Sequence, residues 1–179
     1  RFIFSTTDDV FSQIFQTSVS PNVCQHLPGP NKDVFYPTVL AYTSSMFAFW
    51  RGTIRYRVSV AKTAYHSGRL RLSFIPVVKT FVVPTGTELS NAYSVIWDLR
   101  ESSDITIDVP FVYPLDMAPI SGLTGIDSNQ PDLSTGFFEI TVLNPLRASE
   151  TVAQQVSCNV WVSSPDMCFA VSRRVPGIR

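Results

Sequence analysis

The alternation of polar and apolar residues in segment 51–76 constrains the fold more than any other feature of this sequence. Two strand-length runs, 53–61 and 69–75, carry apolar side chains at every second position, and arginines and serines lie between them. Successive side chains of a strand point to opposite faces of a sheet. The two runs therefore predict strands with one buried and one arginine-bearing face, and the short turn between them predicts that they pair.

Eight strand-length segments are predicted along the chain, most of them rich in Val, Ile, Phe, Tyr and Thr. They are 1–6, 10–19, 53–61, 69–75, 93–99, 104–111, 137–143 and 155–162, the last extending towards 171. Most of the 13 prolines and 8 glycines fall between these segments, where proline marks loops and edges because it cannot donate to a sheet ladder. The polar stretch 98–104 predicts a hairpin connection.

One segment, 37–50, has the spacing of a helix instead. Its apolar residues recur in steps of three and four, and Pro37 suits a first helical turn. The positions are Val39, Tyr42, Met46, Phe49 and Trp50. We expect the aromatic face of this helix to cap the core and not to bind a cofactor.

The strand pattern predicts an all-β fold in which two sheets pack face to face. An eight-stranded antiparallel jelly roll satisfies it, with the helix as an insertion. An immunoglobulin-like sandwich remains an alternative, although the chain lacks the Cys…Trp…Cys spacing of that fold. The 179 residues are predicted to form a single domain, 1–179.

Composition favours a chain that contacts other proteins. Charged residues make up 16% of the sequence, against roughly 25% in an average soluble domain. The 14 basic and 14 acidic residues give a net charge of zero. The chain has no polybasic run, so strong binding of nucleic acid by this segment is not indicated. The arginines at 173, 174 and 179 are interpreted as a solvated tail.

The cysteines and histidines do not indicate a disulfide framework, a metal site or an enzyme. Cys24, Cys158 and Cys168 are an odd, widely spaced set, which is typical of a chain kept reduced, and Cys158 is in phase with core valines. His26 and His66 lie 40 positions apart, without a metal-binding spacing. No nucleophile elbow or phosphate-binding loop occurs. We therefore expect no cofactor and no catalytic residue.

Five phrases resemble, in order, the jelly-roll shell domain of picorna-like virus capsid proteins. They are Phe49-Trp50-Arg51-Gly52-Thr53-Ile54; His66-Ser67-Gly68-Arg69-Leu70 with 74–76; Val95-Ile96-Trp97-Asp98-Leu99 with 105–111; Leu143-Asn144-Pro145-Leu146; and Val160-Trp161-Val162 with Phe169. In the usual strand letters they resemble the start of D, the D–E turn with E, strands F and G, the end of H, and I. The predicted helix would then lie between strands C and D.

This resemblance, which is nearest to dicistroviruses, iflaviruses and marnaviruses, implies the function. Such proteins are cut from a polyprotein, and three related jelly rolls tile an icosahedral shell around positive-strand RNA. Strands B, I, D and G would form one sheet and C, H, E and F the other. The implied partners are two related subunits and copies of this chain, in a virion assembled in the host cytoplasm. In such capsids a basic N-terminal arm often contacts the genomic RNA, and here that arm would precede Arg1. The chain opens in mid-strand, so its N-terminus is predicted to be processed.

The resemblance carries a set of signature positions. They are Trp50, Arg51, Gly52, His66, Ser67, Gly68, Arg69, Trp97, Asp98 and Pro145. His66 is expected to make turn or interface contacts and not to act as a base. Asp8-Asp9-Val10-Phe11 departs from the Asp-Asp-Phe motif that some dicistrovirus capsids use in maturation cleavage, so Asp8 and Asp9 are interpreted as an acidic turn. The loop 114–135 is expected to form a subunit contact or outer surface.

Two other classes of protein are alternatives to a capsid subunit. A secreted jelly-roll recognition module, such as a lectin or a trimeric ligand, would usually carry paired cysteines or Asn-x-Ser/Thr sequons, and the chain has no such sequon. A cupin-like enzyme would need metal ligands that the sequence does not offer. No apolar run approaches the 18 residues of a membrane span.

Overall fold

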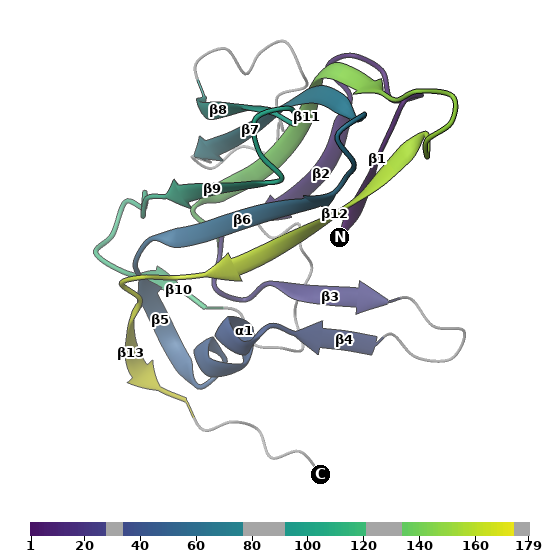
Figure 1. Cartoon of the computed structure of the whole chain (residues 1–179). Coiled ribbons are helices and arrows are strands. Elements are labelled where there is room, and N and C mark those ends of the chain that lie inside the picture. Colours follow the sequence, from purple (N-terminus) through teal and green to yellow (C-terminus); the bar gives the residue numbers. More distant parts are fainter. Residues whose placement is uncertain (28–33, 77–91, 121–133, 174–179) are drawn as a thin grey trace.

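Two four-stranded antiparallel sheets face each other and form the body of the molecule (Figure 1). The computed structural model describes residues 1–27, 34–76, 92–120 and 134–173. The first sheet has the order β1-β12-β6-β9, with β1 at Phe2–Ser5, β12 at Gln155–Ser163, β6 at Ile54–Ala61 and β9 at Asp104–Val109. The second has the order β2-β11-β7-β8, with β2 at Gln13–Ser18, β11 at Gly136–Arg147, β7 at Ser67–Pro76 and β8 at Tyr93–Asp98.

These strand orders confirm the predicted jelly roll. Read in chain order as strands B to I, the two sheets are B-I-D-G and C-H-E-F, as the resemblance implied. The pairs β1–β12 and β2–β11 join strands from opposite ends of the chain, so neither sheet can form until most of the chain is present. The immunoglobulin-like alternative is not the observed topology.

The prediction that 53–61 and 69–75 pair with each other was wrong. β6 pairs with β12 and β9, whereas β7 pairs with β11 and β8, so the short connection crosses from one sheet to the other. The connection 98–104 is likewise not a hairpin, because β8 and β9 belong to different sheets. Alternation fixes which face of a strand is buried, but it carries no information about the neighbouring strand. The predicted arginine-bearing faces are present, one on the outside of each sheet.

The core lies between the two inner faces. Tyr56 of the first sheet stacks on Phe138 of the second, with ring centroids 4.2 Å apart and an interplanar angle of 6°. Both side chains are fully buried, as are Phe4, Leu70 and Leu72. Each such side chain contributes about 1.5–3 kcal/mol through its removal from water. Cys158 is also fully buried, which confirms its predicted place in the core.

The predicted helix is present but shorter than expected. Helix α1 spans Val39–Ser44, and Thr38 caps it by accepting a hydrogen bond from the Ala41 N–H at 3.1 Å. Residues 47–50, which were predicted to continue the helix, belong instead to strand β5 at Phe47–Arg51. The spacing of their apolar side chains fits both structures, and pairing with two further strands decides for the strand.

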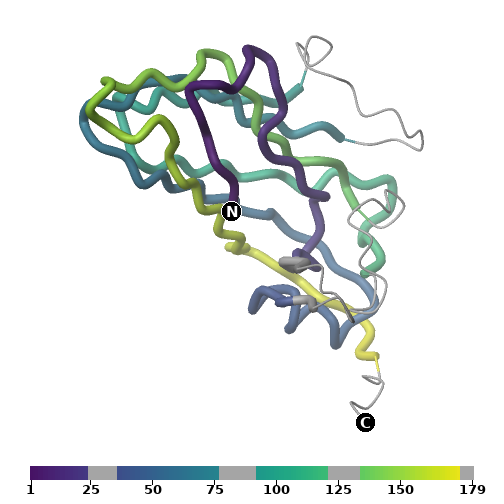
Figure 2. The backbone as a smooth tube through the Cα atoms, turned by 90° about the vertical axis from the view of Figure 1, so that its right-hand side faces the viewer, coloured from purple at the N-terminus to yellow at the C-terminus, as the bar shows by residue number. Residues whose placement is uncertain are grey.

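Five short strands were not predicted as separate elements, although the expected extension of 155–162 towards 171 reaches β13 and the resemblance placed the start of strand D within β5. A three-stranded sheet has the order β10-β5-β13, with β10 at Ala118–Pro119 and β13 at Cys168–Ser172, and a pair is formed by β3 at Cys24–Leu27 and β4 at Val34–Pro37. Figures 1 and 2 place α1 and β13 at the same end of the molecule, away from the β1–β2 turn. Strands of two to five residues are too short to give a clear periodic signal.

The connections at the opposite end are tied together by hydrogen bonds. The N–H of Thr6 donates to the carbonyl of Gln154 at 3.0 Å, and the N–H of Leu99 donates to the carbonyl of Gly68 at 3.0 Å. The segment 10–19 was predicted as a strand, but β2 begins only at Gln13. Most of the loop 114–135 lies outside the described residues, and within its described part Ala118–Pro119 forms β10.

Candidate functional site

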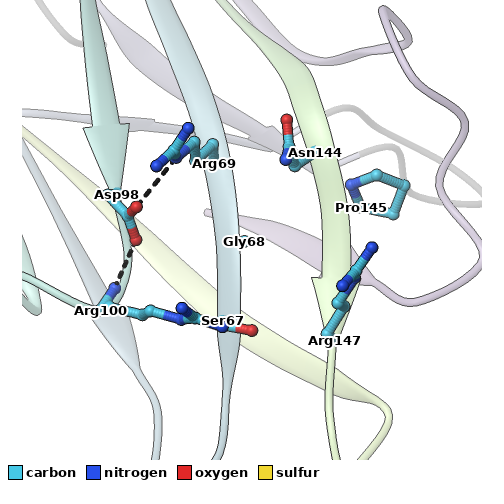
Figure 3. Close-up of a pocket in the computed structure, with 8 residues that line it drawn as sticks. All are labelled: Ser67, Gly68, Arg69, Asp98, Arg100, Asn144, Pro145 and Arg147. Carbon is cyan, nitrogen blue, oxygen red and sulfur yellow. Dashed lines mark hydrogen bonds and ion pairs between the residues drawn. The ribbon is translucent and has the colours of Figure 1, made fainter.

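Five of the ten signature residues line a single hollow on the second sheet (Figure 3). They are Ser67, Gly68, Arg69, Asp98 and Pro145, which come from the start of β7 and the ends of β8 and β11. The hollow has a volume of about 210 Å³. Segments separated by some 80 residues in the sequence are thus brought together, which spacing alone could not have indicated.

Three further residues complete this hollow, named here the arginine hollow. They are Arg100, Asn144 and Arg147. Neither arginine is a signature residue, yet each lies two positions after one, Asp98 or Pro145. Irregular pairing of β11 with β7 between Val142 and Arg147 allows the end of β11 to carry its side chains to the hollow.

Asp98 organises the arginine hollow. Its Oδ2 accepts a hydrogen bond from Nε of Arg69 at 2.9 Å, and its Oδ1 accepts one from the main-chain N–H of Arg100, also at 2.9 Å. These bonds hold the pKa of Asp98 below its usual value, with the main-chain donor as the largest cause and the Arg69 hydrogen bond as the second. The carboxylate is therefore kept ionised, with both of its oxygens engaged.

His66, next to the hollow, is a buried structural residue. Its Nδ1 accepts a hydrogen bond from the main-chain N–H of Thr63 at 3.1 Å. A ring nitrogen that accepts from an amide carries no proton, so the proton lies on Nε2, which donates to the carbonyl of Ala153 at 2.8 Å. Nδ1 is thus bonded within the β6–β7 turn, and Nε2 joins this turn to the β11–β12 connection. Neither ring nitrogen is left free to act on a substrate.

The signature residues Trp50, Arg51 and Gly52 make packing contacts around β5. The Trp50 ring is fully buried and meets the Phe111 ring edge-on, with centroids 5.3 Å apart. The guanidinium of Arg51 lies over the same phenyl ring, 5.8 Å from its centroid. Gly52 has φ +145°, and a Cβ there would come within 2.9 Å of the carbonyl oxygen of Asp166. Glycine is required at this position by both conformation and space.

Trp97, the remaining signature residue, closes the core beside the arginine hollow. Its indole ring is 2% exposed, and its Nε1–H donates to the hydroxyl of Ser102 at 2.9 Å. Trp97 and Asp98 are consecutive residues of β8, so they point to opposite faces of the second sheet. Trp97 therefore packs inward, whereas Asp98 faces the hollow.

A second surface of interest is a set of exposed apolar side chains on α1, the turn after it, β5 and β13, at the end opposite to the β1–β2 turn. This basal patch consists of Val39, Tyr42, Met46, Phe49 and Val171. Val39, Tyr42 and Met46 follow helical spacing, and the first two are 85% and 61% exposed. The N–H of Arg173 donates to the carbonyl of Met46 at 2.7 Å, which holds β13 against the end of the helix.

The described residues contain no group of three or more His, Cys, Asp or Glu side chains that could hold a metal ion. Burial raises the pKa of the Cys158 thiol to about 12, so that thiol stays protonated and is a poor nucleophile. None of the helices in the described parts of the chain has the length and apolar composition needed to cross a membrane.

Comparisons with known proteins agree with this geometry. The chain is 32% identical over 180 residues to the structural polyprotein of Cricket paralysis virus, covering 95% of the chain and 20% of the polyprotein. It is 35% identical over 154 residues to the structural polyprotein of Acute bee paralysis virus, covering 76% of the chain and 17% of that protein. The chain therefore spans a fifth or less of these relatives.

Solved structures show the same fold. The native virion of Kashmir bee virus at neutral pH contains a chain with a TM-score of 0.80 and 28% identity, which covers 94% of this chain and 67% of that one. A chain of deformed wing virus gives a TM-score of 0.85 at 24% identity, covering 96% of this chain and 45% of the viral one. The profile of the picornavirus capsid protein family (Rhv) matches residues 27–121, more than half of the sequence. This chain belongs to the picornavirus capsid protein family.

Proposed function

We propose that this chain is a structural subunit that assembles with two related jelly-roll proteins and with copies of itself into an icosahedral shell around positive-strand RNA. The basal patch is the observation that carries the proposal. Its side chains are exposed although the sandwich core is already complete without them, so the fold alone gives them no packing partner. Apolar surface of this kind is typical of permanent subunit interfaces.

The remaining parts of this proposal follow from the family and from charge. Residues 1–179 act as one domain, and the ten signature residues support the fold and its turns. The net charge of zero favours contact with RNA through a basic segment outside this chain. We place assembly in the host cytoplasm and assign the chain no catalytic step. The secreted recognition module finds no support among the comparisons.

Assembly can be tested by co-expression with the two related subunits. The double variant Val39→Lys/Tyr42→Lys places charges on the basal patch and is expected to abolish shells on a sucrose gradient and in negative-stain electron microscopy. The matched control Val39→Ile/Tyr42→Phe keeps the patch apolar and should assemble. Both positions are exposed, so thermal unfolding of the isolated chain should change little. Shells formed in normal yield by the lysine variant would refute a role of the patch in assembly.

A further inference from the structure

The arginine hollow carries more positive charge than its own acidic residue neutralises. Arg69, Arg100 and Arg147 line it, and Asp98 is the single carboxylate among its lining residues. Both oxygens of Asp98 already accept hydrogen bonds, one from Arg69 and one from the main chain of Arg100. The hollow therefore keeps a net charge of two positive units, although the chain as a whole is neutral.

The guanidinium groups of Arg100 and Arg147 make no ion pair or hydrogen bond with any residue that the structure describes. The outer face of the first sheet differs in this respect. There Arg55 forms two hydrogen bonds with Asp108, at 2.6 and 2.7 Å, and Arg57 contacts Asp104 at 3.2 Å. The two β6 arginines are thus matched with carboxylates, whereas Arg100 and Arg147 at the hollow are not.

The unmatched donors are arranged around a concave space. Figure 3 shows Arg100 and Arg147 on opposite sides of the first residues of β7, with Arg69 farther along the strand. The hydroxyl of Ser67 and the amide of Asn144 add uncharged hydrogen-bonding groups. Donors that approach from several sides suit an anion with more than two oxygens, and planar guanidinium groups bind such oxygens in pairs.

We propose that the arginine hollow binds a small multivalent oxyanion of the phosphate class. The anion supplies the negative charge that Asp98 does not, and it joins the ends of β7, β8 and β11 through their side chains. The inference goes beyond assembly, since a subunit could form shells without binding an anion here, or bind one without forming shells.

The test uses inorganic pyrophosphate, titrated into the full chain by isothermal calorimetry at constant ionic strength. We expect saturable binding at one site. The variant Arg100→Gln/Arg147→Gln should weaken the Kd by at least about tenfold, because each charge-assisted hydrogen bond contributes that much or more. Asp98 keeps its bond from the Arg100 main chain in this variant, so folding should be preserved, and thermal unfolding checks it. Arg57→Gln removes an arginine from the other sheet and is the matched control.

Succinate, a dicarboxylate, is titrated in parallel. Binding of pyrophosphate that is lost in the double variant, kept in Arg57→Gln and at least about tenfold weaker for succinate supports the proposal. Equal binding of succinate would overturn it in favour of a site for acidic side chains. Absence of pyrophosphate binding, or equal loss in Arg57→Gln, would also overturn it.

Discussion

The Nε2–H of His66 donates a hydrogen bond to the main-chain carbonyl of Ala153, 2.8 Å away and 87 positions later in the chain. The bond joins the turn before β7 to the connection before β12. These two strands belong to different sheets, so the histidine fastens the two layers of the sandwich at their turn end. Its Nδ1 accepts from Thr63, which fixes the neutral tautomer described above.

Replacing His66 by alanine should destabilise the fold. The substitution leaves the Thr63 N–H and the Ala153 carbonyl without their partner in a place where His66 itself is 3% exposed. We expect a loss of about 2–3 kcal/mol in the free energy of unfolding, measured by denaturant titration. Tyr65→Ala changes the neighbouring side chain, which is 73% exposed, and should cost little. Equal stabilities of the two variants would contradict this role for His66.

Gly136 at the start of β11 should not tolerate a side chain. Its φ is +154°, and a Cβ would overlap the carbonyl oxygen of Ile75 on the neighbouring strand β7. Because a backbone atom in a sheet cannot move aside, Gly136→Ala is expected to cost about 1–3 kcal/mol in thermal or chemical unfolding. At Gly68 the nearest atom is the ring of Phe4 at 3.0 Å, which can shift, so Gly68→Ala should cost less. The reverse order would contradict this explanation.

The faces of the strands could be predicted from the sequence, because burial repeats with the period of the side chains. In β6 the residues Ile54, Tyr56 and Val58 are buried, as the alternation indicated. The partner of each strand could not be predicted in this way, and the pairing proposed for 53–61 and 69–75 failed for that reason. The correct strand order came from the resemblance to capsid proteins.

The arginine hollow, too, could be predicted only in part from the sequence. Arg69 and Asp98 were found as parts of separate phrases, and their contact depends on β7 pairing with β8 in a register that sets these two residues opposite each other. Arg100 and Arg147 were missed because neither belongs to a recognisable motif: Arg100 lies in the polar turn after β8, and Arg147 is the last residue of β11. Only the assembled sheet shows that they share one hollow and that Asp98 cannot neutralise both.

Glu139 should make stability decrease as pH rises. This residue of β11 is 2% exposed, and burial raises its pKa, against an opposing effect of Arg71. A carboxyl whose pKa is higher in the folded state stabilises fully below the unfolded value, about 4.3, and this stabilisation is lost as pH rises through the folded value. The variant Glu139→Gln should lack this loss of stability. Its free energy of unfolding, relative to that of the original chain, should therefore rise between acidic and neutral pH. Unfolding free energies measured across that range would refute the expectation if the two profiles ran parallel.

Asp98 should make stability decrease as pH falls, which is the opposite of the effect of Glu139. Its pKa is lowered by hydrogen bonds from the Arg100 main chain and from Arg69, so its stabilising effect is present above the unfolded value, about 3.9, and is lost as pH falls through the folded one. Asp98→Asn should therefore flatten the acid limb of the stability profile. Because the site is exposed to solvent, the change should be small and should shrink further in high salt. An acid limb that is unchanged in the variant would show that these bonds do not differ between the folded and unfolded states.

Tyr56 offers a separate test of how its hydroxyl and its ring contribute to the core. The ring stacks on Phe138, whereas the hydroxyl is buried without a hydrogen-bond partner in the described parts of the chain. Burial raises the pKa of this hydroxyl, because the surroundings disfavour its charged form. Tyr56→Phe removes a buried polar group that has no partner and should leave stability unchanged or raise it by about 1 kcal/mol.

Tyr56→Ala, in contrast, removes the stacked ring between the two sheets and should cost about 3–5 kcal/mol in the free energy of unfolding. Chemical denaturation of both variants separates the two contributions, because they differ only in whether the ring remains. A marked loss in Tyr56→Phe would mean that the hydroxyl has a bound partner, such as a buried water. A large gap between the two variants would instead establish that the aromatic stack, and not the polar group, holds the sheets together at this point.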